Sequence, residues 1–157
     1  MNILNDSIKN MSSNLKNLSE RMTGCNYTVD FDIVTFKFSN NFDFKIENLK
    51  ILFPKSTIEG NFEISSLEKF YNEINHAFLY GPNELDNESV EKQSEILNEW
   101  KDEFYKTLNN FIKTPPKSIY KHLPASDSWF DFYIMWGFCY ILLWENEGIV
   151  IAGQAWD

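Results

Sequence analysis

The sequence predicts an α+β protein, with a largely antiparallel sheet of about five to six strands packed against about three helices. Two runs of strand-like sequence, over residues 26–53 and 129–154, flank a run of helical periodicity over residues 65–113. Short turn-like segments separate the strands within each run, so we expect hairpin connections. Strands grouped apart from helices are typical of this class, and the expected order is α-β-β-β-α-α-β-β-β.

The N-terminal residues, 1–23, are expected to form a helix. Apolar residues step along it by four and by three through a polar background, and Gly24 is placed to end it. These apolar residues are Leu4, Ile8, Met11, Leu15, Leu18 and Met22. The spacing also suits a coiled-coil dimer, but the flanking positions lack the paired charges of such a dimer. We therefore expect the helix to pack on the sheet, with an oligomer interface as the alternative.

The first strand is expected over residues 26–38. Apolar residues occupy alternate positions up to Ile33 and the other parity from Val34 onward. One extra residue that moves the apolar set to the opposite face is what a β-bulge produces. The sequence therefore predicts a β-bulge at Ile33-Val34.

Two shorter strands are expected next, over residues 42–46 and 49–53. A three-residue loop at 39–41 would place Phe38 opposite Phe42 and Phe36 opposite Phe44. Pro54 ends the third strand. The following residues, 56–64, are expected to cross irregularly, with room for a short strand at 62–64.

Two helices are predicted in the middle of the chain. Ser65 and Glu68 form a capping-box pattern at the start of the first, which ends at residues 80–82. The second runs from about Asn87 to Lys113 and ends at the Thr114-Pro115-Pro116 segment.

The stretch FYIMWGFCYILLW, residues 132–144, contains thirteen residues without a charge. A helix that crosses a bilayer needs about 20 apolar residues, so this is not a membrane segment. Its β-forming residues, with Gly137 and the ENEG segment as turns, predict strands at 129–135, 138–144 and 149–154. Because both faces are apolar, we expect a central strand that is covered on both sides. Residues 117–128 before it are expected to form a loop.

Size and charge limit the classes of function. The 157 residues are expected to form one domain, and their net charge is −9. Arg21 is the single arginine among 14 basic residues, which disfavours nucleic acid as a partner. An acidic protein is suited to meeting a basic one, although solubility alone also explains acidity. No leader-like apolar segment and only Cys25 and Cys139 point to the cytoplasm.

The longer helix carries the clearest charge feature. Its carboxylates fall on one side of a helical wheel, opposite Leu97, Trp100, Phe104, Leu108 and Phe111, so we expect them to face outward. They form the candidate partner-binding surface: Glu88, Glu91, Glu95, Glu99, Asp102 and Glu103. A solvated helix face is the plainer interpretation, and a docking surface for a basic protein is the functional one.

A second candidate lies near the C-terminus. Asp127, Trp129 and Asp131 would share one side of a strand, where two carboxylates flank an indole ring. With Trp144 and Trp156 they could line an aromatic pocket for a small molecule. A small hydrolase that uses His122, Asp127 and Asp131 is a minor alternative.

No motif of a nucleophile elbow, phosphate loop, dinucleotide site or zinc site occurs. We therefore expect a protein that is not an enzyme and that uses no metal or cofactor. We also expect it to be monomeric or homodimeric.

In its small size, acidity and wealth of asparagine and aromatic residues, the chain resembles bacterial immunity proteins that neutralise toxin domains. A phage inhibitor of a host defence protein would have the same profile. The leading hypothesis is thus a non-catalytic inhibitor that sequesters a basic protein through an acidic helix face. A small-molecule binding protein is the alternative.

Overall fold

The computed structural model describes residues 2–4, 15–17, 20, 28–39, 42–53, 59–79, 90–124, 128–129 and 132–156. The elements are β1 (Asn2–Leu4), β2 (Thr28–Lys37), α2 (Ile46–Leu52), β3 (Gly60–Ile64), α3 (Leu67–Leu79), α4 (Val90–Phe111), β4 (Ser118–Pro124), β5 (Ser128–Trp129), β6 (Phe132–Leu143) and β7 (Glu147–Trp156). Residues 15–17 are also helical.

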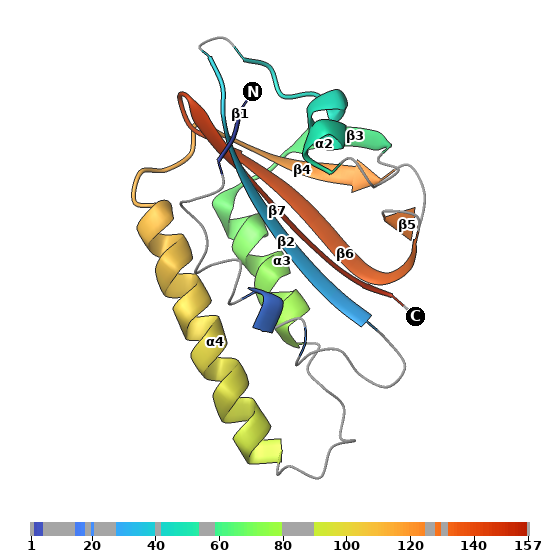
Figure 1. Cartoon of the computed structure of the whole chain (residues 1–157), viewed down its shortest axis with the longest axis vertical. Coiled ribbons are helices and arrows are strands. Elements are labelled where there is room, and N and C mark those ends of the chain that lie inside the picture. The colour runs from blue at the N-terminus through green and yellow to red at the C-terminus, as the bar shows by residue number, and fades with distance from the viewer. Residues whose placement is uncertain are drawn as a thin grey trace.

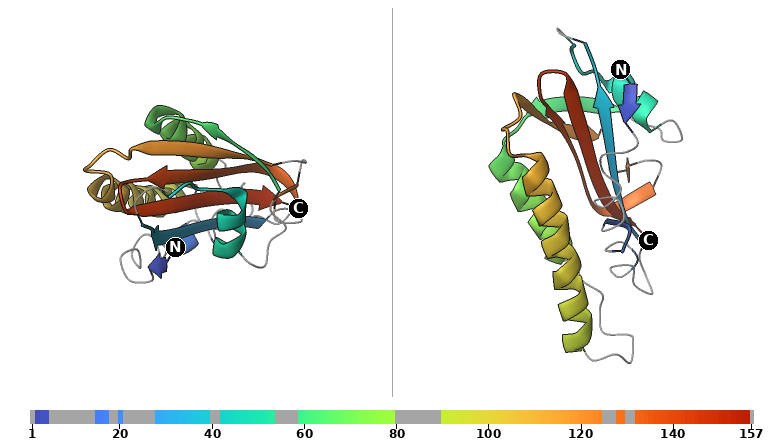
Figure 2. Two further views of the ribbon diagram at one scale, coloured as in Figure 1. Left: turned by 90° about the horizontal axis from the view of Figure 1, so that it is seen from above. Right: turned by 60° about the vertical axis from the view of Figure 1, so that its left-hand side comes forward.

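The strands form one antiparallel sheet. It has seven strands in the order β1-β2-β7-β6-β4-β3, and β5 pairs with β6 outside this path. Helices α3 and α4 cover one face of the sheet, and α2 lies against the other (Figures 1 and 2). The α+β class with an antiparallel sheet, predicted from the sequence, is confirmed.

Two apolar cores lie on opposite faces of this sheet. The helix-side core is centred on Phe70, Ile74, Phe104, Leu108 and Tyr140. The α2-side core contains these residues of the sheet and of α2 with its flanks: Phe36, Phe44, Leu49, Leu52, Phe53, Cys139, Ile141, Leu143, Val150 and Ala152. The sheet therefore separates two packed layers.

Strand β6 lies between β4 and β7, and both of its faces are buried. Tyr140 and Leu142 belong to the helix-side core, whereas Cys139 and Ile141 belong to the α2-side core. The prediction of a central strand covered on both sides is confirmed. The expected turn after it is also present, since the Trp144 N–H donates to the Glu147 carbonyl at 2.8 Å.

The prediction of a turn at Gly137 is wrong. Residues 132–143 form one strand, and Gly137 pairs with Gln154 of β7. The irregularity in this strand is a shift of register between Ile134 and Trp136. A glycine inside a strand commonly lies next to such a bulge, so the signal was real but its meaning was different.

Strand β2 is regular, and the predicted bulge at Ile33-Val34 is wrong. Its register with β7 runs without a break from Thr28 opposite Trp156 to Lys37 opposite Glu147. Ile33 packs in the helix-side core, whereas Val34 packs against the α2-side core. The apolar residues of β2 therefore change from one face to the other because each face packs against a different core, and not because of an extra residue.

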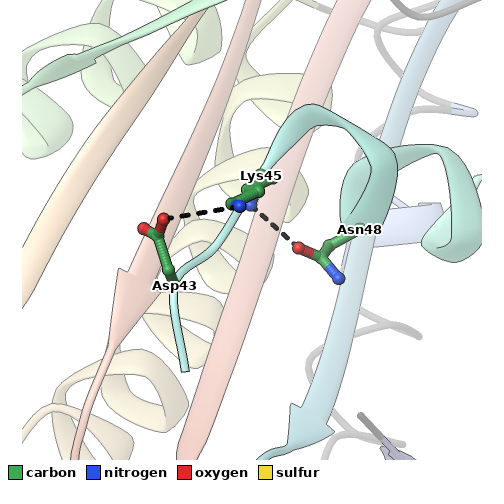
Figure 3. A network of polar contacts seen from close by, with 3 residues as sticks. All are labelled: Asp43, Lys45 and Asn48. Carbon is green, nitrogen blue, oxygen red and sulfur yellow. Dashed lines mark hydrogen bonds and ion pairs between the residues drawn. The ribbon is translucent and has the colours of Figure 1, made fainter. Parts of the chain in front are cut away.

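The strands predicted at 42–46 and 49–53 are wrong, because residues 46–52 form helix α2. Leu49, Leu52 and Phe53 lie three and four residues apart and are buried on one side of it. The Lys45 backbone N–H donates to Asn48 Oδ1 at 2.8 Å and closes the start of the helix, beside the exposed Asp43–Lys45 ion pair (Figure 3).

The aromatic contacts expected for that hairpin are nevertheless present. The rings of Phe38 and Phe42 stack with centroids 4.8 Å apart, and those of Phe36 and Phe44 are 5.4 Å apart. Apolar contact brought the side chains together without a β-ladder. Residues 40 and 41 of the expected loop lie outside the described part of the chain.

A strand, β4, occupies residues that were expected to form a loop. It pairs with β3 and with β6, and β3 is longer than the short strand expected at 62–64. Lys121 and His122 interrupt the apolar pattern of β4, and this hid the strand. Lys121 forms an ion pair with Glu73 of α3. The His122 side chain is buried, with 2% of its surface exposed.

Helices α3 and α4 follow the predicted segments. Ser66, rather than Ser65, caps α3, because its Oγ accepts from the Lys69 N–H at 3.2 Å. Tyr71 of α3 donates to Asn109 of α4 at 2.9 Å, and in return Tyr105 of α4 donates to Asn75 of α3. The residues expected at the end of α3, 80–82, and at the start of α4, 87–89, lie outside the described residues. Of the helices that are described, none is long and apolar enough to cross a membrane.

The expected N-terminal helix is corrected at its start. Leu4 lies in β1 opposite Thr35 of β2, so the first residues form an edge strand. Leu15 is helical, 1% exposed and part of the helix-side core. Ile8, Met11, Leu18 and Met22, the other central residues of the expected apolar stripe, lie outside the described residues.

Candidate functional site

The acidic face of α4 is the sequence-predicted surface that the structure describes best. Glu95, Glu99, Asp102 and Glu103 are all exposed. Glu91 lies on α4, but its side chain is not among those described, and Glu88 lies outside the described residues. The sequence placed the four described carboxylates correctly on the solvent side of the helix.

The buried side of α4 fixes the direction in which these carboxylates point. Phe104 and Leu108 are fully buried in the helix-side core, and Lys101 is half-buried beside them. Loss of hydration lowers the pKa of the Lys101 ammonium group. The rotation of the helix is therefore set by packing, and its carboxylates are held outward.

The start of α4 extends beyond the end of the sheet (Figure 1; Figure 2, right). Carboxylates at i,i+4, such as Glu95 and Glu99, repel one another by a few tenths of a kcal/mol per pair. The exposed carboxylates of α4 therefore place like charges close together on a projecting helix. A cationic partner would relieve the repulsion.

The predicted His122, Asp127 and Asp131 site is only partly described. His122 lies in β4, and its Nε2 is 2.9 Å from the Glu59 carbonyl oxygen. The Phe62 ring meets the imidazole edge-on at 5.8 Å, and burial lowers the imidazole pKa although the Glu59 contact acts in the opposite direction. Asp127 and Asp131 lie outside the described residues. What is described of His122 is a buried ring that joins β4 to the segment before β3.

The predicted aromatic pocket is not assembled around Trp144. Trp144 is half-buried against the helix-side core, and its Nε1–H donates to the Thr114 carbonyl at 2.6 Å. Trp156 lies at the opposite end of β7 from the β6–β7 turn, which separates the two by about 30 Å of strand. Trp129 lies in β5, and the side chains of Trp129 and Trp156 are not described.

Groups for nucleophilic or metal chemistry are equally constrained. Cys139 is fully buried, and burial raises the pKa of its thiol, so little thiolate is present at neutral pH. Within the described ranges, no three His, Cys, Asp or Glu side chains gather where they could hold a metal ion.

Sequence reasoning missed a second polar group, at the start of β2. Asp30 lies directly opposite Gln154 of β7, and Asp32 lies two residues further on the same face. In the sequence both aspartates alternate with apolar residues of β2, but nothing in it identifies Gln154 as their neighbour. A pairing between strands so distant in the chain leaves no local signal.

Comparisons with known proteins show a likeness of fold. No protein family matches the chain, and no curated protein does. A crystal structure of citrus MAF1 in space group P 31 2 1 superposes with a TM-score of 0.61 at 12% identity, over 94% of this chain and 97% of that one. A second, in space group C 2 2 21, gives 0.57 at 12% identity, over 92% and 98%. At this identity the likeness shows the arrangement of helices and strands alone.

Proposed function

We propose that this chain is a non-catalytic inhibitor that sequesters a basic protein through the acidic face of α4, in the manner of a toxin-immunity or phage anti-defence protein. The observation that carries the proposal is the set of four exposed carboxylates on one helix, Glu95, Glu99, Asp102 and Glu103. The buried face of α4 supports it, because the carboxylates cannot turn inward.

Electrostatics favours such a role. Complementary charge speeds the encounter of two proteins and disfavours partners of the wrong sign. A row of carboxylates along a projecting helix presents the repeated negative charge that a nuclease-like surface binds in a polyanion. The net charge of −9 adds a long-range field of the same sign.

Two potential catalytic side chains that the structure describes, those of Cys139 and His122, are buried, which supports binding rather than turnover. The Cys139 thiol is buried within the α2-side core. The His122 imidazole is buried between β3 and β4. Neither is presented at a surface where a substrate would meet it.

The test is a charge reversal on α4. We expect native mass spectrometry of the tagged chain, recovered from the lysate of its own host, to show a stoichiometric basic polypeptide. The variant with Glu95→Lys, Glu99→Lys and Asp102→Lys should lose this polypeptide, because it presents three positive charges where the partner expects negative ones. Raising the salt concentration should weaken the wild-type complex, since exposed charges are screened.

A matched control separates local from global charge. Glu20→Lys, Glu59→Lys and Glu147→Lys change the net charge by the same amount at exposed positions outside α4, and this variant should keep the partner. Equal retention by the α4 variant, equal loss by the control, or an acidic bound polypeptide would each reject the proposal.

A further inference from the structure

A group of three oxygen-bearing side chains lies on the α2 side of the sheet, at the start of β2. Directly opposed residues on antiparallel strands have Cβ atoms about 5 Å apart, and diagonal neighbours are about 7–8 Å apart. Asp30 is opposite Gln154, and Asp32 is diagonal to it on the same face. Val150 and Ala152, four and two residues before Gln154, belong to the α2-side core and identify this face.

Gln154 is unusual among the polar residues of the sheet. Its side chain is 6% exposed, and its buried Oε1 atom meets no hydrogen-bond donor among the described residues. Buried polar atoms in proteins are nearly always hydrogen-bonded, so an acceptor without a donor indicates a missing partner. The cross-strand register directs this side chain to the face that carries Asp30.

The two aspartates add negative charge at the same place. The surrounding protein raises the pKa of both carboxyl groups by removing water, and the charge of Asp30 raises that of Asp32 further. Both side chains still reach solvent. In the described part of the chain, no ion pair to either carboxylate is seen.

Helix α2 itself lies away from this part of the sheet. Helix α2 and the aromatic residues before it, Phe42 and Phe44, pack against Phe36 near the end of β2. The start of β2 and the end of β7 lie at the other end of the sheet, away from α2 (Figures 1 and 2). Asp30 and Asp32 are exposed, so a ligand can reach their carboxylates from solvent.

We propose that Asp30, Asp32 and Gln154 form a binding site for a cationic nitrogen group, either a guanidinium or a primary ammonium. Such groups only donate hydrogen bonds, and these three side chains offer two carboxylates and an amide oxygen as acceptors. The site lies on the opposite face of the sheet from α4, so it is independent of the function proposed above.

A metal ion fits the same atoms less well. Calcium takes about six to eight oxygen ligands, and magnesium requires near-ideal octahedral geometry. Two carboxylates and one amide oxygen, two of them on one strand and one on its neighbour, supply too few ligands for calcium. A guanidinium, by contrast, has a planar fork of donors that can span neighbouring acceptors.

The test is a titration of the ¹⁵N-labelled full chain, followed by NMR. The probes are N-acetyl-arginine amide, spermidine and calcium chloride. We expect the two organic cations to cause saturable shifts of the backbone amides of residues 30–32 and 152–154. The double variant Asp30→Asn, Asp32→Asn should weaken binding at least about tenfold, because each charge-assisted hydrogen bond becomes a neutral one. Gln154→Met, which keeps the volume and removes the acceptor, should weaken it less.

The comparison of probes identifies the source of the cation. Tighter binding of N-acetyl-arginine amide than of spermidine would assign the site to a protein side chain, and the reverse would assign it to a free polyamine. The control variant Glu95→Gln, Glu99→Gln should bind as the wild type does, which separates this site from α4. Absence of saturable shifts, binding unchanged in the Asp30 and Asp32 variant, or shifts caused by calcium alone would overturn the proposal.

The variants are expected to fold. Replacing the two aspartates removes repulsion between like charges, so the double variant should melt at or above the temperature of the wild type at neutral pH. A loss of binding together with an unchanged or raised melting temperature is therefore a loss of the site and not of the structure.

Discussion

Buried polar side chains mark the positions where this sheet departs from a simple apolar core. His122 lies in β4 between Phe62 of β3 and the Glu59 carbonyl, with almost no exposure to water. Desolvation makes the charged imidazole costly in the folded state, and this is why its pKa is lowered.

The lowered pKa of His122 predicts a loss of stability on acidification. The unfolded chain binds a proton near pH 6.5, whereas the folded chain binds it only at lower pH, so this contribution is complete above pH 6.5 and falls as the pH drops below it. The free energy of unfolding from urea titrations should fall by up to about 1.4 kcal/mol per pH unit in this range. His122→Gln should remove this slope.

His76, the second of the two histidines, provides the control. It is exposed on α3, and the slope measured for His76→Gln shows how much of the pH dependence the second histidine contributes. A slope that persists in the His122 variant would show that other groups cause it.

Among the elements, β7 illustrates how aromatic packing selects small residues. A Cβ atom at Gly153 would lie 2.7 Å from atoms of Phe31 and Phe138, and one at Gly148 would lie 2.5 Å from Phe36 Cζ. The two glycines face opposite sides of the strand. Each leaves room for a phenylalanine ring to lie across the backbone.

Gly153→Ala is therefore expected to destabilise the protein by about 1–3 kcal/mol, because a methyl group would force the two rings out of place. Thermal unfolding monitored by circular dichroism measures the effect. A melting temperature equal to that of the wild type would show that the Phe31 and Phe138 rings move at little cost.

The elements that were predicted well are those with a long, one-sided or uniformly apolar pattern. Helix α4 and the buried strand β6 belong to this group, since their periodicity or lack of charge is sustained over many residues. Helix α2 was missed because Leu49 and Phe53 fit both a strand and a helix. The choice between strand and helix depends on packing against Phe36 and Val150 of the sheet, and this packing cannot be seen in the local sequence.

The candidate sites follow the same division. Glu95, Glu99 and Asp102 could be placed because a helical wheel needs only local spacing. The contact between Asp30 and Gln154 depends on the pairing of β2 with β7, which no local pattern contains. Local sequence patterns therefore predict a surface that one element forms, but not a surface that two distant elements form together.

At the scale of the whole molecule, Leu15 in the N-terminal segment packs into the core of its own chain. Leu15 is 1% exposed and packs with Phe70, Phe104 and other residues of the helix-side core. A residue buried within one chain cannot also serve as the seam of a coiled-coil dimer.

Leu15→Ala should therefore lower the free energy of unfolding by about 2–5 kcal/mol, as expected for a truncated core leucine. It should leave the oligomeric state unchanged. Urea denaturation gives the first quantity, and sedimentation velocity gives the second. A wild-type dimer that dissociates on this substitution would contradict the intramolecular packing and would place Leu15 at a subunit interface.

The pairing of β2 with β7 also has a consequence for the way the chain is made. Strand β2 leaves the ribosome about a hundred residues before its partner β7 is made. Until then, among the described strands, β2 has only the short edge strand β1 as a native pairing partner. The nascent chain must remain unaggregated while the residues between β2 and β7 are made, because the sheet closes only after β7 has emerged.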